Sequence, residues 1–273
     1  LLRRTDYRRL EVIVVDNDSV EPETFKLFED LKNDERVSIL PVAGDFNYSR
    51  LNNIAAADAE GEILLLLNND IDVIKPDWLT ELVSHAIRPD VGCVGAKLLY
   101  ADGRVQHAGV RLGAGHFDGG RGVGSHIGLF SDRWDIGYFG SYAVTRDVGC
   151  VTAACLAVRK DVYAAVDGLD EVNLKVAFND VDFCLRVREA GYRIIWTPFA
   201  ELYHLESASR GTDQTPEKHA RFMREARYMR DHWGPALDSD PFYNPNFDNY
   251  EADYYLDFSR KIEALTGSGV GRR

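Results

Sequence analysis

Two stretches of sequence decide the fold: L-E-V-I-V-V-D-N-D-S at residues 10–19 and E-I-L-L-L-L-N-N-D-I-D at residues 62–72. In each stretch a nearly continuous apolar run leads directly into a cluster of Asp and Asn residues. A continuous apolar run, unlike an alternating one, is typical of a parallel strand that is covered on both faces. The sequence therefore predicts two fully buried strands, each with polar side chains at its carboxyl end.

Helical and strand-like segments alternate around these two runs, which predicts an α/β fold. In the first hundred residues we expect helices near 22–33, at 49–60 and at 76–87, with a short strand at 37–42. Strands that alternate with helices form an open, mostly parallel sheet through right-handed crossovers. The first half of the chain is therefore expected to form such a sheet, flanked by helices.

The pattern changes after residue 90. Apolar segments on either side of Asp102-Gly103 predict a hairpin. Residues 113–147 are rich in Gly and aromatic residues and lack a clear periodicity, and so long a connection is usually functional or mobile. Further along we expect a strand at 151–158, a helix at 181–191, a strand at 194–197 and an amphipathic helix at 215–233.

The composition excludes several classes of protein. Lys and Arg number 32 against 44 Asp and Glu, a formal charge of −12, whereas a protein that binds a nucleic acid polymer needs clustered positive charge. The apolar runs are far shorter than the roughly 20 residues that span a bilayer. The four cysteines are too sparse for a disulfide scaffold, which favours reduced thiols in a cytoplasmic protein.

The polar clusters after the two apolar runs are candidate ligand-binding residues. In an open α/β sheet, ligands bind outside the carboxyl ends of the strands, so we expect both clusters to face one crevice. Acidic oxygens there suit Mg²⁺ or Mn²⁺, which in turn can hold a diphosphate. Asp and Asn are also the commonest turn residues after a strand, and spacing alone leaves both interpretations open. The sequence lacks the glycine motifs of dinucleotide and P-loop sites.

A second candidate group is N-D-V-D, which precedes the helix expected at 181–191. Asn179 or Asp180 could simply cap that helix. Asp180 and Asp182 lie about 200° apart around a helix, so they do not face the same substrate. One of them can act as a general base while the other pairs with Arg186 or with Arg188.

The third candidate is His204, in Y-H-L-E-S at 203–207 after the strand expected at 194–197. A single histidine is more often a packing residue than a ligand. Beside an oxygen-rich metal site, however, its imidazole becomes a plausible additional ligand.

Together these segments resemble glycosyltransferase family 2, inverting enzymes of the GT-A fold that use nucleotide-sugar donors. V-I-V-V-D-N-D-S at 12–19, F-N-Y-S-R-L-N-N-I-A-A-A-D-A-E-G at 46–61 and L-L-L-L-N-N-D-I-D-V at 64–73 are similar to its nucleotide-binding half. Further segments are similar to a bacterial branch that makes O-antigen and other cell-surface polysaccharides and has rhamnosyltransferase-like members. These segments lie at 97–110, 179–193, 203–211 and 240–247.

The fold that the resemblance implies is a GT-A-type open mixed α/β sheet. A mostly parallel nucleotide-binding half is followed by a hairpin and an acceptor half, with flanking helices and a helical and irregular C-terminal tail. We expect a single GT-A-like domain at 1–235, divided into a nucleotide-sugar-binding half at 1–100 and an acceptor and catalytic half at 101–235. A C-terminal extension at 236–273 completes the chain.

The resemblance also implies roles for individual residues. Asp180 matches the aspartate that acts as catalytic base, and Asp70 matches a ligand of the divalent cation, Mn²⁺ or Mg²⁺. His204 and Asp72 follow as further ligands of that cation. The nucleotide-binding residues that the resemblance implies are Asp16, Asn17, Asp18, Arg50, Asn53 and Asn69. Turn chemistry and helix packing explain Asn17, Arg50 and Asn53 about as well.

The reaction implied is inverting transfer of a sugar from a UDP- or dTDP-sugar to a hydroxyl of a saccharide or lipid-linked saccharide. No nucleic acid polymer takes part, and the implied location is the cytoplasm, with peripheral association to the inner face of the membrane. The alternative is a catalytically silent nucleotide-sugar-binding or scaffold domain. A nucleotidyltransferase would need a Gly-rich, basic triphosphate loop near the first strand, and the sequence shows none.

Three departures from the family pattern bear on these expectations. The metal motif begins with Asn, as N-N-D, so only Asp70 supplies charge there. Ala153 stands where the branch usually has glycine, which narrows the expected sugar pocket. The family also begins with a strand ahead of the first one expected here, which indicates part of a larger polypeptide.

Overall fold

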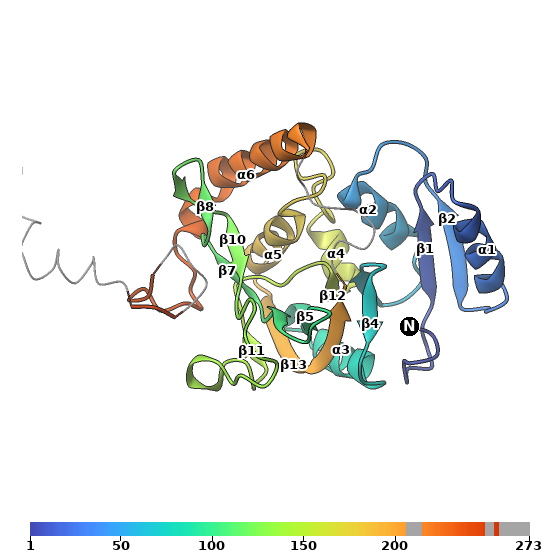
Figure 1. The fold of residues 1–273 in the computed structure, drawn as a ribbon, viewed down its shortest axis with the longest axis horizontal. Coiled ribbons are helices and arrows are strands. Elements are labelled where there is room, and N and C mark those ends of the chain that lie inside the picture. The colour runs from blue at the N-terminus through green and yellow to red at the C-terminus, as the bar shows by residue number, and fades with distance from the viewer. Residues whose placement is uncertain (206–214, 249–253, 257–273) are drawn as a thin grey trace, which may run out of the picture.

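The computed structural model describes residues 1–205, 215–248 and 254–256, and it shows a central mixed sheet between two layers of helices (Figure 1). Residues 206–211 of the expected family segment at 203–211, and much of the expected C-terminal extension, lie outside the described residues. The predicted α/β class and its mixed sheet are confirmed.

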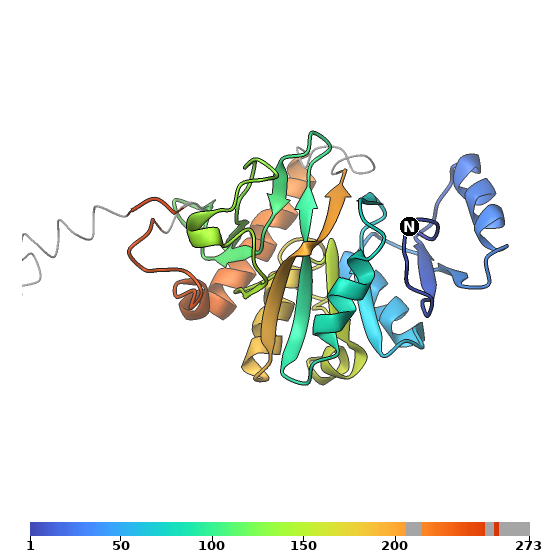
Figure 2. The same ribbon diagram turned by 90° about the horizontal axis from the view of Figure 1, so that it is seen from below.

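The first apolar run forms a small sheet of its own. Strand β1 (Val12–Asp16) pairs in parallel with β2 (Val37–Pro41), and these two strands make a separate two-stranded sheet. Helix α1 (Pro22–Leu31) connects them, and Pro22 begins the helix, where its missing N–H costs nothing. In Figure 2 this unit lies to one side of the central sheet.

The prediction of a fully buried β1 is wrong. All five of its residues are only half-buried. The physical reason is that, among the described residues, β1 pairs with β2 alone, so its other edge is not covered by a neighbouring strand. Helix α2 (Tyr48–Asp58) follows β2, and the Asn47 side chain caps it by accepting a hydrogen bond from the N–H of Arg50.

The central sheet has the strand order β11, β13, β5, β12, β3. The second apolar run becomes β3, in which only Leu64 and Leu66 are buried, so the prediction of a fully buried strand is wrong here as well. Among the described residues β3 is an edge strand that pairs with β12 alone. β12 is antiparallel both to β3 and to β5, whereas β13 runs parallel to β5. β5 occupies the middle of this sheet, and each of its nine residues is buried. The bounds are β3 Ile63–Leu67, β5 Val91–Leu99, β11 Arg146–Asp147, β12 Cys155–Arg159 and β13 Arg193–His204.

Two hydrophobic clusters cover the two faces of this sheet. On one face, α3 (Trp78–Ala86) packs against alternate residues of β5, β12 and β13, and Trp78 and Leu82 are fully buried there. The other face packs against the helices of the second half. These helices are α4 Lys160–Ala165, α5 Asn179–Glu189 and α6 Pro216–Leu237.

Two short strands pair with the central sheet at the end where Asp70 and His204 lie. β4 (Ile71–Val73) pairs antiparallel with β13, and β6 (Val105–His107) pairs antiparallel with β5, which confirms the hairpin predicted around Asp102-Gly103. The long connection at 113–147 contains four small strands and a 3₁₀ turn, η1. These elements and the strand that precedes them are β7 Val110–Leu112, β8 His116–Phe117, β9 Gly120–Arg121, β10 Gly124–His126, η1 Tyr138–Gly140 and the β11 strand given above.

The state of the cysteines agrees with the prediction made from the composition. All four cysteines are buried and free, as expected for reduced thiols. Within the part of the chain that the structure describes, no helix combines the length and apolar character needed to cross a membrane.

The close approach of β5 to the segment before β12 gives a stability prediction. A Cβ added at Gly95 would lie 2.5 Å from Cβ of Val151, an atom fixed to the backbone, so Gly95→Ala forces the two segments apart. We expect a loss of about 1–3 kcal/mol in the free energy of unfolding, measured by urea denaturation. Gly61→Ala is the matched control, because its added methyl meets nothing closer than 3.4 Å. If both variants unfold at the same urea concentration, this packing constraint does not exist.

Candidate functional site

Asp70 and His204 lie side by side at the end of the central sheet. β3 ends at Leu67, the chain turns, and β4 then pairs with the last residues of β13, with His204 opposite Ile71. The backbone N–H of Leu205 donates to the carbonyl of Asp70 at 2.9 Å. This pairing brings Nε2 of His204 to 3.1 Å from Oδ1 of Asp70, although the two residues are far apart in the sequence.

The Asp70 carboxylate is suited to holding a cation. Its Oδ1 is buried and has no hydrogen-bond partner, which is costly for a carboxylate oxygen unless a positive charge compensates it. One carboxylate and one imidazole are few ligands for a cation that the protein holds alone. They do suit Mg²⁺ or Mn²⁺ that is held mainly by substrate phosphates and water. The residues present therefore fit a divalent cation.

Asp72 does not join this pair. Its carboxylate accepts two hydrogen bonds from the guanidinium of Arg4, at 2.7 and 3.0 Å. Among the described residues, no three His, Cys, Asp or Glu side chains converge closely enough to hold a metal ion. Asn69 is exposed in the turn between β3 and β4. The predicted ligand set is thus reduced here to Asp70 and His204.

Asp180 stands in the first turn of α5, and its carboxylate meets the segment before β12. Oδ2 accepts a hydrogen bond from the N–H of Ala153 at 3.1 Å, and the hydroxyl of Thr152 bonds to the same side chain. Burial raises the pKa of Asp180, an effect that these hydrogen bonds only partly offset. No Lys or Arg of the described residues forms an ion pair with it. This carboxylate is therefore held in position without being neutralised.

Asp182, two residues further along α5, has the opposite environment. It is buried, its Oδ2 pairs with the guanidinium of Arg186 at 2.7 Å, and its Oδ1 accepts a hydrogen bond from the indole of Trp233 at 2.8 Å. The prediction that one aspartate pairs with an arginine while the other is available is confirmed. The residue that occupies the N-cap position is Phe178, at φ +59°, and it forms no side-chain cap. Such a left-handed conformation is costly for Phe and is typical of functional sites.

A short path of contacts joins the candidate cation pair to Asp180. The Asn68 side-chain amide lies 3.3 Å from Nε2 of His204, and the Asn68 backbone N–H donates to the carbonyl of Ala154 at 3.0 Å. The next residue back, Ala153, holds Asp180. Both candidate centres therefore lie at the same end of the sheet, where β3 ends and β12 begins.

Two histidines, the buried His107 and the half-buried His126, lie behind this path. Nδ1 of His107 is 2.7 Å from Nδ1 of His126, and Nε2 of His107 accepts a hydrogen bond from the N–H of Thr152 at 3.4 Å. Burial lowers the pKa of both histidines, that of His126 to about 4, and both stay neutral at physiological pH. The pair therefore supports the segment before β12 that bonds to Asp180, without adding charge to it.

The predicted nucleotide residues around β1 gather at one loop. Asn17 donates from its amide to the carbonyls of Val42 and Gly44, at 2.9 and 2.8 Å, and Asp18 accepts from the N–H of Gly44 at 2.7 Å. Asp16 accepts from the N–H of Ser19 at 3.1 Å. These contacts are those of turn residues, and they also bring three polar side chains together beside the loop after β2.

Arg50 joins this group, whereas Asn53 does not. The Arg50 guanidinium donates to the carbonyl of Ala43 at 3.3 Å, within the same loop. The side-chain oxygen of Asn53 instead accepts hydrogen bonds from the hydroxyl of Tyr163 at 2.6 Å and from the N–H of Leu169 at 2.9 Å. Its side-chain nitrogen donates to the carbonyl of Leu169 at 2.9 Å. Its hydrogen bonds tie α2 to the loop after α4, which is the packing role that the sequence left open.

The loop from Val42 to Tyr48 leads from the predicted nucleotide-binding residues to α2, whose first residue contacts the segment that bonds to Asp180. The hydroxyl of Tyr48, at the start of α2, donates to the carbonyl of Ala153 at 2.9 Å. Ala153 thus receives Tyr48 on one side and holds Asp180 on the other, and its side chain is buried. Ala153 thus joins the start of α2 to the helix that carries Asp180.

Sequence reasoning did not find Gln106, His107, His126 and Thr152. Gln106 and His107 are in a segment that it assigned to a hairpin, and Thr152 in one that it assigned to a strand. The only available signal was chemical: two adjacent polar residues, Gln and His, stand between the apolar residues Val105 and Ala108, and both are buried. A buried polar residue in a strand requires a partner, which is a reason to suspect a site.

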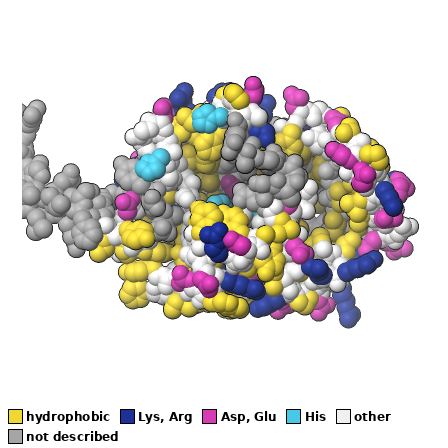
Figure 3. All heavy atoms as spheres, in the orientation of Figure 1, with side chains coloured by type: hydrophobic (Ala, Val, Ile, Leu, Met, Phe, Trp, Pro, Cys, Tyr) yellow, Lys and Arg dark blue, Asp and Glu magenta, His cyan; other side chains and the backbone are white. Residues whose placement is uncertain are grey.

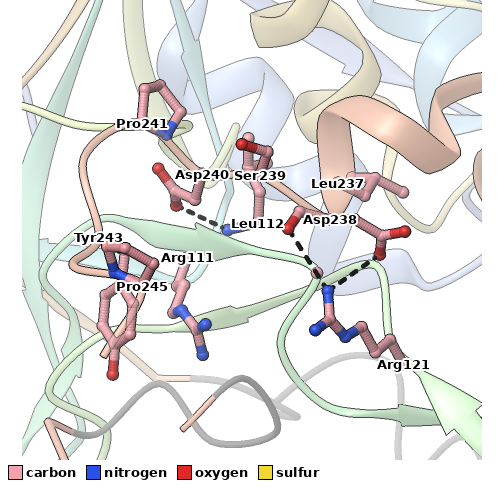
Figure 4. Close-up of a pocket in the computed structure, with 11 residues that line it drawn as sticks. Arg111, Leu112, Arg121, Leu237, Asp238, Ser239, Asp240, Pro241, Tyr243 and Pro245 are labelled. Carbon is pink, nitrogen blue, oxygen red and sulfur yellow. Dashed lines mark hydrogen bonds and ion pairs between the residues drawn. The ribbon is translucent and has the colours of Figure 1, made fainter. Parts of the chain in front are cut away.

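A pocket of about 260 Å³ lies elsewhere, between β7 and the segment after α6 (Figure 4). There Asp240 accepts a hydrogen bond from the N–H of Leu112 at 3.0 Å, and Arg121 pairs with Asp238 at 3.4 Å. No predicted site residue lines it. Its contacts fasten the C-terminal segment to the domain.

On the face shown in Figure 3, acidic and basic side chains are interspersed, and the basic ones do not form a continuous patch. This distribution agrees with the net charge of −12.

Comparison with known proteins decides the family. The family model described as Glycosyl transferase family 2 matches residues 1–163. The chain belongs to this family. A mannosyltransferase from Pyrobaculum calidifontis, solved with GDP-Man and Mn²⁺, superposes on this family 2 chain with a TM-score of 0.58 and 16% identity. That superposition covers 99% of this chain and 70% of the mannosyltransferase. The likeness confirms the GT-A fold.

Two curated relatives are much longer than this family 2 chain. The uncharacterized protein y4gI of Sinorhizobium fredii is 50% identical over 261 residues, which cover 95% of the chain and 28% of the relative. The O-antigen biosynthesis protein RfbC of Myxococcus xanthus is 42% identical over 246 residues, which cover 90% of the chain and 18% of the relative. The chain thus spans about a quarter or less of these proteins.

The environment of Asp180 gives a stability prediction with a definite sign. Because its pKa is raised in the folded protein, protonated Asp180 favours the folded state, and this contribution is lost as the pH rises through the folded pKa. At pH 7 the ionised carboxylate therefore lowers the stability of the folded protein. We expect the Asp180→Asn variant to unfold at a higher temperature than the wild type. The difference should shrink as the pH falls toward 4, measured by thermal unfolding.

Asp182→Asn is the matched control for this prediction. It removes the negative charge that pairs with Arg186 and accepts a hydrogen bond from Trp233. We therefore expect the free energy of unfolding to fall by roughly 1–3 kcal/mol at pH 7. If Asp180→Asn were destabilising to the same degree as Asp182→Asn, Asp180 would be a structural residue like its neighbour.

Proposed function

We propose that this chain is a metal-dependent inverting glycosyltransferase. Its donor is a nucleotide sugar, a UDP- or dTDP-sugar, and its acceptor is a hydroxyl of a saccharide or a lipid-linked saccharide in the synthesis of a cell-surface polysaccharide. Family membership supports glycosyl transfer, and the relative named for O-antigen biosynthesis supports the polysaccharide. We place the reaction in the cytoplasm, at the inner face of the membrane, within a larger polypeptide.

The observation that carries this proposal is the contrast between Asp180 and Asp182. Two aspartates on one helical turn differ in that Asp182 is neutralised by Arg186, whereas Asp180 keeps an unpaired carboxylate with a raised pKa. A raised pKa improves a carboxylate as a proton acceptor, because basicity rises with pKa. The path of contacts that joins Asp180 through Ala153, Ala154 and Asn68 to His204 supports its role as base.

The residues of the chain divide the work of the reaction between them. Asp16, Asn17, Asp18 and Arg50 surround the loop at 42–44, where they bind the nucleoside part of the donor. Asp70 and His204 hold the divalent cation at the donor diphosphate. When bound, that cation neutralises the charge that develops on the leaving diphosphate, without a proton donor.

Asp180 takes the proton of the acceptor hydroxyl. The hydroxyl oxygen attacks the anomeric carbon from the face opposite the diphosphate, the bond from that carbon to the diphosphate oxygen breaks, and the configuration inverts. The hydrogen bonds from Ala153 and Thr152 hold the carboxylate in place for this transfer. The segment at 113–147, which follows β7 and contains His126, orders over the donor or shapes the acceptor cleft.

The second candidate function is a catalytically silent nucleotide-sugar-binding domain. The observation in its favour is that β1 and β2 form a separate sheet in which β1 is only half-buried. Release of UDP or dTDP that depends on an added saccharide acceptor would exclude the silent domain. A thermal-shift screen of nucleotide sugars with Mn²⁺ identifies the base and the sugar for that assay.

The base assignment predicts a selective defect. Asp180→Asn cannot accept the proton, so we expect transfer to fall by about 10²–10⁴-fold while the Kd for the donor, measured by calorimetry, stays near that of the wild type. Asp182→Asn serves as the control for general damage to α5. Wild-type turnover in Asp180→Asn would refute the role of Asp180 as base.

The cation site predicts a defect that depends on the metal. Asp70→Ala should weaken binding of the nucleoside diphosphate by about tenfold or more in Mn²⁺, but hardly at all in EDTA, measured by calorimetry. Asp72→Ala is the matched control, since that carboxylate lies against Arg4 instead of His204. An equal loss in Mn²⁺ and in EDTA would show that Asp70 contributes through packing or charge and not through a cation.

A further inference from the structure

The imidazole of His204 is held on both of its nitrogens. Nδ1 lies 2.7 Å from Oε1 of Gln106, a short hydrogen bond. On the other side, the amide nitrogen of Asn68 lies 3.3 Å from Nε2. His204 and Gln106 come from different strands, β13 and β6, and β5 lies between them and pairs with both. The orientation of this ring is therefore fixed by the central sheet itself.

The atoms that face the ring determine where its proton sits. The side-chain oxygen of Gln106 can only accept, so Nδ1 must carry the proton and donate it. The amide nitrogen of Asn68 can only donate, so Nε2 must present its lone pair. Both contacts favour the same neutral tautomer, with the proton on Nδ1 and an open lone pair on Nε2.

This tautomer leaves two acceptors face to face. The Nε2 lone pair and Oδ1 of Asp70 are 3.1 Å apart, and Oδ1 is buried without a hydrogen-bond partner. The opposite tautomer would carry its proton on Nε2 and would leave no lone pair there for a cation. A structure that disfavours that proton keeps the gap between nitrogen and oxygen available for a positive ion.

We propose that Gln106 is a positioning residue of the cation site, which holds His204 in the tautomer whose Nε2 can bind a divalent cation together with Asp70. A metal-binding imidazole generally donates its other N–H to an oxygen acceptor that orients the ring and increases its basicity. Gln106 is almost fully buried, 4% exposed, and so it has no competing contact with bulk water. The inference rests on the proposed cation role of Asp70 and His204.

The position of Gln106 also connects the cation site with the candidate base. Its neighbour His107 accepts the hydrogen bond from Thr152, whose hydroxyl bonds to Asp180. One short strand, β6, thus places adjacent residues against the two centres. A shift of β6 along β5 would displace the contact of Gln106 with His204 and the contact of His107 with Thr152 together. Both polar residues of this strand are buried.

The first test reads the tautomer directly and requires no metal, activity or substitution in Gln106. Long-range ¹H–¹⁵N correlation spectra of the 30.7 kDa chain, labelled on its seven histidines, distinguish a protonated ring nitrogen from one with a lone pair. The His204 signals are assigned by their loss in His204→Gln. At pH 8 without metal we expect Nδ1 protonated and Nε2 unprotonated. A proton on Nε2 of His204 in the wild type would overturn the proposal.

The second test measures Mn²⁺ binding by titration calorimetry and by the electron paramagnetic resonance signal of free Mn²⁺, with the nucleoside diphosphate present. Gln106→Leu removes the acceptor, and we expect Mn²⁺ affinity to fall by about 10–100-fold. Gln106→Glu still accepts from Nδ1 and should bind Mn²⁺ as tightly as the wild type or more tightly. A merely structural role would not separate Leu from Glu in this order.

Thr197→Val is the matched control for loss of a buried polar group on β13. Its hydroxyl bonds to Glu81 at 2.6 Å, away from His204, so Mn²⁺ affinity should not change even if stability falls. Wild-type Mn²⁺ affinity in Gln106→Leu would contradict the proposal. If the wild type binds no Mn²⁺ at all, the proposed cation role fails, whereas the tautomer spectrum still decides whether Gln106 sets the proton of His204.

Discussion

The hydrogen bond from the N–H of Leu205 to the carbonyl of Asp70 is the interaction on which the candidate site depends. It is the last rung of the pairing between β4 and β13, and it fixes the distance between two side chains that the sequence separates by more than a hundred residues. With it, the buried Oδ1 of Asp70, which has no hydrogen-bond partner, lies 3.1 Å from Nε2 of an imidazole whose ring is already oriented.

The fold could be predicted from the sequence wherever local pattern decides structure. The continuous apolar run at 62–67, the helical stretch near 22–33 and the Asp102-Gly103 turn each predicted an element close to the observed one. The burial of β1 could not be predicted, because it depends on which strands become its neighbours. Apolar character shows that a strand can be covered, but not that it is.

The extent of β13 was underestimated for a related reason. The expected strand at 194–197 ends before Pro198, since proline cannot donate to a sheet ladder. The observed strand continues to His204 because the register shifts between Thr197 and Glu201, which accommodates the proline in an irregularity and resumes pairing with β5. This continuation carries His204 to Asp70. The candidate site was therefore predictable as residue types at strand ends, while the side chains that orient them, Gln106 and Thr152, depend on pairing that no local pattern reveals.

The complete burial of β5 has a consequence for how the chain is made. β5 ends at Leu99, but its partner β13 begins only at Arg193, roughly a hundred residues later. At a synthesis rate of about 5–20 residues per second, the ribosome takes roughly 5–20 s to supply that partner. During this interval an apolar strand has one edge without its final neighbour, and such edges pair readily with other chains. β6 pairs with Leu98 and Leu99 of β5 on the edge opposite to β13, so its earlier synthesis does not cover the edge that waits for β13.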